Sequence, residues 1–333
     1  MLLFFLFFLI CCGLGYPILN RIDWRKAPGG LEDLQRYAEM VVSPATGDLS
    51  NHTQFRVFVP YMAKPIYRVA NHHTGTWDPI MFSLLVVNSL FVAATVTILL
   101  VVTDREVGSY SIGLGAALIY LLNFAVPNLR LMGFIDAGEG FFLMLLVWAL
   151  QQERYWALPL LGVVGATAKE TFVPYLVVFS LVWWLSSRKE QREPRRAAVW
   201  MVTSWIAALG SLVVVQWAIT GVYRSPLRFG LELHENSAYL THFFRSLVDR
   251  NLWYIFFWLL PLSLFRMNRL PRNWKFAAAA ASVTAFVLDA YYGGAPGTIG
   301  RTLFSVVGPL LSASVAVLLF TGSGSQTSSP DLV

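Results

Sequence analysis

Two carboxylates in separate loops have the residue type and surroundings for acid–base chemistry. Asp33 has Tyr37 one helical turn further along the chain, and Asp136 stands between two apolar runs. A carboxylate held beside a reacting hydroxyl or amine can accept its proton. Simpler readings stay open for both residues. Asp33 can be a solvated acid on an amphipathic helix, and Asp136 can cap the helix that follows it.

Other charges interrupt apolar runs at turns too short to reach water. Lys169 and Glu170 form one such turn, and Arg301 follows a glycine-rich stretch. Charges in turns of this kind are expected to point into a polar cavity between helices, although an interfacial ion pair or a snorkelling side chain also explains them. Asp33, Asp136, Lys169, Asp289 and Arg301 come from separate loops, yet all fall on one predicted face of the protein.

Histidines and acids in the first long loop leave room for a divalent metal. His52, His72 and His73 share this loop with Asp48 and Asp78. Their spacing matches no diagnostic ligand pattern, so the sequence does not assign a metal or any other cofactor. The chain also contains no P-loop, dinucleotide-binding fingerprint or HExxH motif.

The elements that carry these residues are predicted to be membrane helices. Apolar residues make up 56% of the 333 residues and charged residues only 13%, whereas a soluble domain carries about 25% charge. We therefore expect an all-α polytopic transmembrane bundle of about ten spans, formed by a single domain over 1–320, with 321–333 as a short disordered tail. The apolar runs cover 1–19, 79–103, 109–127, 138–151, 156–168, 172–186, 197–220, 252–265, 276–291 and 302–320. The fourth and fifth are short enough to be spans of a thinned bilayer or a re-entrant hairpin.

Basic residues in the loops predict the orientation of the bundle. The connections 188–196 and 266–275 are rich in Arg and Lys, and two runs separate them. Both can therefore be cytoplasmic, as the positive-inside rule requires. Counting outwards places both termini in the cytoplasm and the long loop 20–78 outside. The net charge of +6 thus reflects membrane orientation, and no nucleic-acid partner is expected.

The long loop 20–78 is expected to contain two interfacial helices. The first would place on its apolar face Leu31, Leu34, Ala38, Val41 and Val42. The second has an apolar stripe of Phe55, Phe58, Val59, Met62, Ile66 and Val69, with Arg56, Lys64 and Arg68 facing away. Pro60 and Pro65 are expected to kink this second helix or to end it early.

This layout resembles the GT-C superfamily of membrane glycosyltransferases, which take sugars from polyprenyl-phosphate donors. The likeness covers about residues 1–310 and rests on short motifs that follow one span, a long external loop and the next external loop. These motifs are Glu32-Asp33 with Tyr37, the segment 54–60, Asp136, the turn 169–171, and Gly300-Arg301 with Ser305 and Pro309.

The resemblance implies a reaction and roles for particular residues. A sugar would pass from a lipid-linked donor to a glycan, lipid or protein acceptor on the outer face of a bacterial inner membrane, as in cell-envelope assembly. Asp33 would be the catalytic base, and Asp136 would fill the second acidic position. The remaining residues expected to bind substrate are Tyr37, Glu170 and the phosphate-holding cations Arg56, Lys169 and Arg301. The family pattern has a tight acidic pair where this chain has Asp136, which leaves metal dependence open.

Two other functions remain compatible with the sequence. A transporter or flippase for a lipid-linked saccharide would use the same charges as a path, but it predicts charges at mid-bilayer, and here they lie at the ends of the runs. A structural subunit of a membrane complex would leave Asp33 merely solvated. An alanine scan of the external charges separates this last case, because a scaffold tolerates such changes singly.

Overall fold

The protein is described by a computed structural model in which every element is helical. The described residues are 1–21, 23–26, 32–45, 55–73, 75–189, 191, 193–223, 238–291 and 297–321. No strand occurs within these ranges, which confirms the all-α prediction. Asp48, His52 and residues 322–333 of the predicted tail lie outside them.

Three helices among the described residues are long and apolar enough to cross a membrane. They are the segment Leu2–Arg21, which comprises α1 (Leu2–Gly15) and α2 (Ile18–Arg21), then α5 (Pro79–Val107) and α10 (Pro194–Thr220). A fourth results if α16 (Thr298–Val306) and α17 (Gly308–Thr321) form one bent span. A membrane protein is therefore indicated by the length and composition of these helices.

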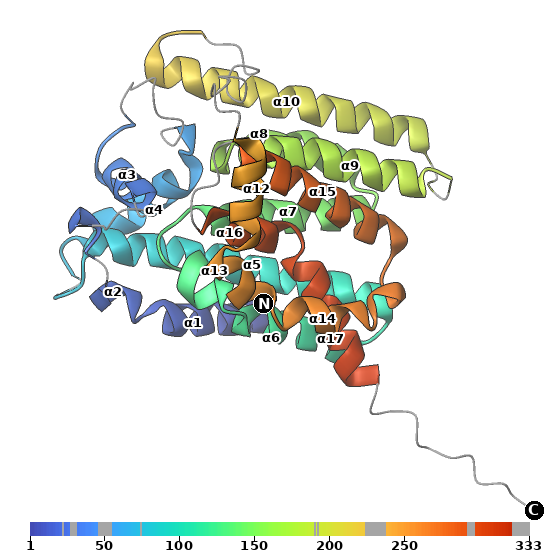
Figure 1. Cartoon of the computed structure of the whole chain (residues 1–333). Helices are drawn as coiled ribbons and strands as arrows, with labels where there is room; N and C mark the ends of the chain where they lie inside the picture. Colours follow the sequence, from blue (N-terminus) through green and yellow to red (C-terminus); the bar gives the residue numbers. More distant parts are fainter. Residues whose placement is uncertain are drawn as a thin grey trace, which may run out of the picture.

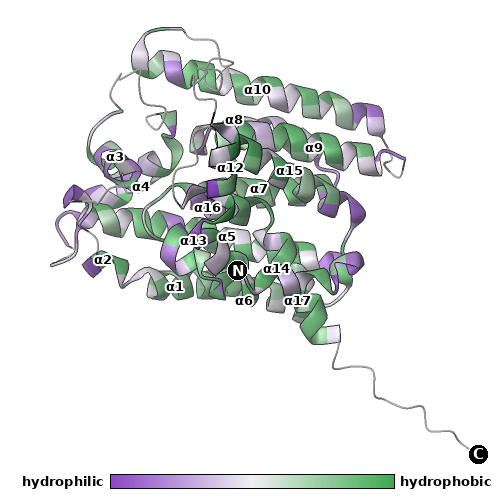
Figure 2. Ribbon diagram, viewed as in Figure 1, coloured by the Kyte–Doolittle hydropathy of each residue, from purple (hydrophilic) through white to green (hydrophobic). Residues whose placement is uncertain are grey.

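Helices that are too short or not apolar enough to be counted among these fill the remaining predicted runs. They are α6 (Tyr110–Leu122), α7 (Asp136–Gln151), α8 (Leu158–Ala168), α9 (Phe172–Ser187), α13 (Arg250–Phe256), α14 (Leu259–Leu264) and α15 (Arg272–Tyr291). Most long helices lie side by side along a common direction (Figure 1). Helix α5 packs against α1, α6 and α7, while α10 packs on α8 and α15 on α9. Apolar residues dominate these helices, and hydrophilic residues gather at their ends (Figure 2).

The two ends of the bundle differ in character. At one end lie α3 (Glu32–Val42) and α4 (Phe58–Ala70), which form a layer over the helix ends (Figure 1). We call this the α3–α4 end. The basic α9–α10 and α14–α15 connections lie at the opposite end (Figure 1). These two basic connections thus lie at the end of the bundle away from the layer formed by the first long loop.

The two amphipathic helices of that loop are present, but the second differs in detail from the prediction. Helix α3 buries Leu34, Tyr37, Ala38, Met40 and Val41, whereas Val42 is exposed. Of the two effects expected of Pro65, an early end of the second helix does not occur, because α4 continues through Pro65 to Ala70. The predicted face is also partly wrong. Helix α4 buries Val59, Pro60, Ala63 and Ala70 and leaves Met62 and Val69 exposed.

Two predicted runs are broken by proline. The run 302–320 is not one straight helix, since α16 and α17 are bent by 63°. Pro309 has no N–H to donate to Ser305, so the helix cannot continue unbroken into α17. The run 252–265 is likewise divided into α13 (Arg250–Phe256) and α14 (Leu259–Leu264), and Pro261 in the first turn of α14 has no N–H to donate to Phe257. The first break matters for function, because it lays α16 against α7.

Candidate functional site

A buried pair of acids lies in the first turn of α7. Asp136 and Glu139 are both buried there. The Nζ of Lys169 lies 2.8 Å from Oδ1 of Asp136 and 3.0 Å from Oε2 of Glu139. Thr171 donates a further hydrogen bond to Glu139. Because α8 ends at Ala168 and α9 begins at Phe172, the short turn between them brings Lys169 and Thr171 to the start of α7.

Two arginines complete the cation side of this pair. One is Arg301 on α16, whose Nη1 lies 3.4 Å from Oδ2 of Asp136 and whose guanidinium carbon lies 4.4 Å from the centre of the Phe134 ring. The other is Arg130, which is fully buried. Arg130 donates to the main-chain oxygen of Asp136, to that of Arg301 at 3.0 Å, and to the hydroxyl of Ser305 at 2.6 Å.

A second group of charges joins α3 to the same turn. Arg56 donates two hydrogen bonds to Glu170, at 2.7 and 2.5 Å, and one to the hydroxyl of Tyr37 at 2.6 Å. Asp33 lies 3.7 Å from Arg56, and its side chain is 38% exposed. Lys169 and Glu170 are consecutive, so the two groups form one connected set.

This set lies at the α3–α4 end and is drawn from six segments of the chain. We call it the polar cluster: Asp33, Tyr37, Arg56, Arg130, Asp136, Glu139, Lys169, Glu170, Thr171, Arg301 and Ser305. Its four acids and four bases are formally neutral together. Buried charges are tolerated when they are paired and hydrogen-bonded in this way.

The neighbouring charges determine the protonation states of Lys169 and Asp136. Burial disfavours the charged form of Lys169, but Asp136 and Glu139 outweigh that effect and raise the pKa of the amine. Burial likewise acts to raise the pKa of Asp136, but Lys169, Arg301 and Arg130 hold it well below its usual range. Asp136 is therefore a firmly ionised partner of cations and a weak proton acceptor. Asp33 is the acid of the cluster that combines an ion pair with an exposed side chain.

All seven site residues predicted from the sequence lie in this cluster: Asp33, Tyr37, Arg56, Asp136, Lys169, Glu170 and Arg301. The side chain of Arg56 is buried and contacts Tyr37, Glu170 and Asp33. Asp289 binds the hydroxyls of Ser246 and Thr298 instead. Arg130 and Glu139 were not among the predicted site residues, although the sequence shows both as charges between apolar runs close to Asp136.

The described histidines of the first loop do not gather around a common point with acids. His72 and His73 are exposed neighbours. Asp78 caps α5 by accepting from the main-chain N–H of Ile80 and also accepts from Trp24. Within the described residues, no group of three or more His, Cys, Asp or Glu side chains could hold a metal ion.

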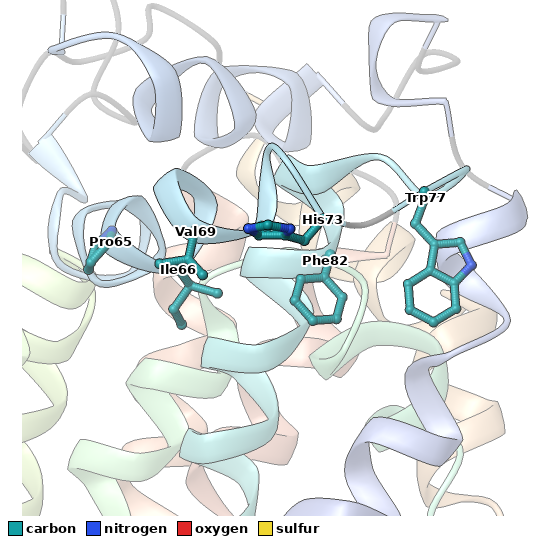
Figure 3. Close-up of a pocket in the computed structure, with 8 residues that line it drawn as sticks. Pro65, Ile66, Val69, His73, Trp77 and Phe82 are labelled. Atoms are coloured by element: carbon teal, nitrogen blue, oxygen red, sulfur yellow. The ribbon is translucent and has the colours of Figure 1, made fainter.

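An open apolar groove lies between α4 and the start of α5 (Figure 3). Its volume is about 790 Å³, and its lining comprises Pro65, Ile66, Val69, Ala70, His73, Gly75, Trp77 and Phe82. The rings of Trp77 and Phe82 stack with centres 6.1 Å apart. The groove could receive hydrocarbon from the side, and it belongs to the same end of the bundle as the polar cluster.

The chain was compared with protein-family models, curated proteins and solved structures, and no match was found.

Proposed function

We propose that this chain is a membrane glycosyltransferase of the GT-C type. It transfers a sugar from a polyprenyl-phosphate-linked donor to a glycan, lipid or protein acceptor on the outer face of a bacterial inner membrane. The observation that carries the proposal is the setting of Asp33, which is 38% exposed and lies 3.7 Å from the buried Arg56. A base needs this combination of access to its substrate and a fixed orientation.

The proposed topology has about ten spans and both termini in the cytoplasm. Each of the ten apolar runs is helical over most of its length. The basic α9–α10 and α14–α15 connections lie at the end opposite to α3 and α4. If the basic end faces the cytoplasm, then the α3–α4 end and the polar cluster lie at the outer face, where a lipid-linked donor and its acceptor would meet.

In the proposed reaction, Asp33 accepts the proton of the acceptor hydroxyl. The acceptor oxygen attacks the anomeric carbon, the bond from that carbon to the donor phosphate oxygen breaks, and polyprenyl phosphate leaves with the electron pair. Arg56 keeps the Asp33 carboxylate in place, and Arg56 is itself held by Tyr37 and Glu170. The proton is thereby removed at a fixed position beside the layer formed by α3 and α4.

Arg301 is the cation best placed to hold the donor phosphate. Lys169 is neutralised by two carboxylates, and Arg56 by a two-bond pair with Glu170. Arg301 makes one 3.4 Å approach to Asp136, and its side chain is 14% exposed. Asp136 then orients Arg301, and the positive charge of Lys169 balances the negative charge of the acids of α7. A charge-assisted contact from Arg301 suits a phosphate at this depth.

A second candidate function is transport of a lipid-linked saccharide without chemistry. Glu139 and Arg130 are fully buried, and charges inside a helical membrane bundle often mark transport paths. Their location at one end of the bundle, rather than midway along it, favours the enzyme.

One experiment separates the two functions. The purified protein is placed in liposomes with a panel of polyprenyl-phosphate-linked hexoses and pentoses and a membrane-lipid and glycan extract as acceptor. The enzyme is expected to release polyprenyl phosphate and to label the acceptor. Movement of the intact donor across the bilayer with no release of polyprenyl phosphate would contradict the proposal and support transport.

A further inference from the structure

Arg130 connects three segments through the forked donors of one side chain. It ends the π-helical turn η3 (Val126–Arg130), which lies between α6 and α7. Its Nη1 donates to the main-chain oxygen of Asp136, and its Nη2 lies 3.0 Å from that of Arg301 and 2.6 Å from the hydroxyl of Ser305. Two of these acceptors belong to the partners of one ion pair, Asp136 and Arg301, whose side chains lie 3.4 Å apart.

The surroundings of Arg130 are built to hold a guanidinium. The side chain is fully buried, and its guanidinium carbon lies 5.6 Å from the centre of the Phe304 ring, which stacks on Tyr120 at 4.7 Å. A Cβ on Gly140 would lie 3.3 Å from Nη1 of Arg130, so glycine there leaves the fork its space. Among the described residues, the acceptors of Arg130 are main-chain oxygens and a hydroxyl, with no carboxylate paired to it.

Arg130 makes its direct hydrogen bonds to the backbone and to a hydroxyl, while its positive charge also helps to keep Asp136 ionised. Had Arg130 served only to neutralise the acids of α7, a direct ion pair to Asp136 or Glu139 would be expected. Its two Nη atoms instead donate to main-chain oxygens, one at Asp136 where α7 begins and one at Arg301 on α16. The break before Pro309 leaves α16 without a straight continuation into α17, so α16 needs a local restraint against α7.

We propose that Arg130 is a positioning residue that sets the register between α7 and α16, and thereby the spacing of Asp136 and Arg301. The inference about register rests on the contacts alone. Its consequence for sugar transfer rests on the proposed function, in which Arg301 holds the donor phosphate. Loss of the fork should loosen α16 against α7 while the rest of the bundle stays as it is.

The Arg130→Lys variant separates the contribution of the forked guanidinium donors from that of the positive charge. Lysine keeps the positive charge but offers a single point donor, which cannot reach two carbonyls and a hydroxyl in fixed directions. Hydrogen exchange is measured on the detergent-solubilised full-length protein. Amides of 136–140 and 298–306 should exchange about ten-fold faster than in the wild type, and those of α5 and α10 should be unchanged. Unchanged exchange in both segments would overturn the inference, and so would equal acceleration throughout the chain.

A milder pair of variants keeps the test decisive if Arg130→Lys fails to fold. Ser305→Ala removes one acceptor of the fork and should accelerate exchange in 298–306 by about three-fold. Ser312→Ala is the matched control, because Ser312 is buried on α17 and its hydroxyl has no hydrogen-bond partner among the described residues. It should change neither segment. Equal effects of the two serine variants would overturn the inference.

Turnover provides a second readout that a merely stabilising residue would not move. In Arg130→Lys, kcat for sugar transfer should fall about ten- to a hundred-fold while KM for the acceptor stays within about two-fold. Normal kcat alongside loosened α16 would show that the register does not serve transfer. A wild type with no transfer at all would refute the proposed function, and the exchange data would still decide the role of Arg130.

Discussion

Arg56 and Glu170 are 114 residues apart in the sequence, yet their side chains meet through two hydrogen bonds of 2.7 and 2.5 Å. Arg56 precedes α4 in the first long loop, and Glu170 lies in the turn between α8 and α9. The pair therefore fastens the α3–α4 layer to the bundle. Because Arg56 also contacts Tyr37 and Asp33, the same pair determines how the proposed base is held.

Breaking this pair should destabilise the protein strongly. Both side chains are about nine-tenths buried, so removing one partner leaves a charge without compensation, at a cost of about 3–5 kcal/mol. Arg56→Gln and Glu170→Gln should each lower the unfolding midpoint, and the double variant should lose less than the two single losses added together. The exposed pair Arg196–Glu193 is the control, with an expected effect under about 1 kcal/mol. Additive losses at the buried pair would show that it is not coupled.

The stabilising effect of Asp136 should disappear in acid. Its pKa is held below the usual range by Lys169, Arg301 and Arg130 against the opposing effect of burial. A carboxyl with a lowered folded-state pKa stabilises the protein above its unfolded-state pKa of about 3.9, and this stabilisation is lost as pH falls towards the folded-state value. Asp136→Asn should therefore unfold at a lower temperature than wild type at pH 7, and the gap should narrow below about pH 4. A gap that does not depend on pH would contradict the assigned ion pairs.

The proposed orientation can be tested by labelling single cysteines from one side. In a variant with Cys11 and Cys12 replaced by serine, cysteine is introduced in place of His72 or Arg195, both of which are exposed. An impermeant thiol reagent added to intact cells should label the first position and not the second. Opening the cells should expose the second. Labelling of both positions from the same side would refute the topology and the location of the site with it.

Binding of the lipid-linked donor should depend on Arg301 more than on other arginines at the α3–α4 end of the bundle. A charge-assisted contact contributes about 1.5–3 kcal/mol, so Arg301→Gln should raise the donor Kd about ten- to a hundred-fold. Arg25→Gln is the control, since Arg25 is mostly exposed and lies 3.6 Å from Asp78. Binding is measured with a short-chain polyprenyl-phosphate sugar. If both variants bind it as the wild type does, the phosphate lies elsewhere.

The sequence predicted which residues gather better than it predicted how they pair. Short turns between apolar runs leave charges no route to water, so Lys169 and Glu170 had to meet partners between helices, and the structure provides them. The identity of those partners depends on long-range packing. Nothing in local spacing indicates that Arg56 reaches Glu170, or that Lys169 binds the acids of α7.

Arg130 and the path of α16 show a different limit of sequence reasoning. A lone arginine near the end of an apolar run is expected to snorkel towards water, and here it is fully buried under α16. The bend before Pro309 could be predicted from the sequence, because proline interrupts a helix. The consequence of the bend could not be predicted, since only the tertiary packing shows that it brings Arg301 and Ser305 to α7.

The central claim is tested most directly by Asp33→Asn in a sugar-transfer assay. The substitution keeps the size of the side chain and removes the basic oxygen. Release of polyprenyl phosphate from the panel of lipid-linked sugars should therefore fall about 10²–10⁴-fold. The unfolding midpoint should barely change, because the side chain is 38% exposed. Glu39→Gln on the exposed side of α3 is the matched control and should transfer sugar normally. Transfer by Asp33→Asn at the wild-type rate would contradict the account and leave Asp33 a solvated acid on an interfacial helix.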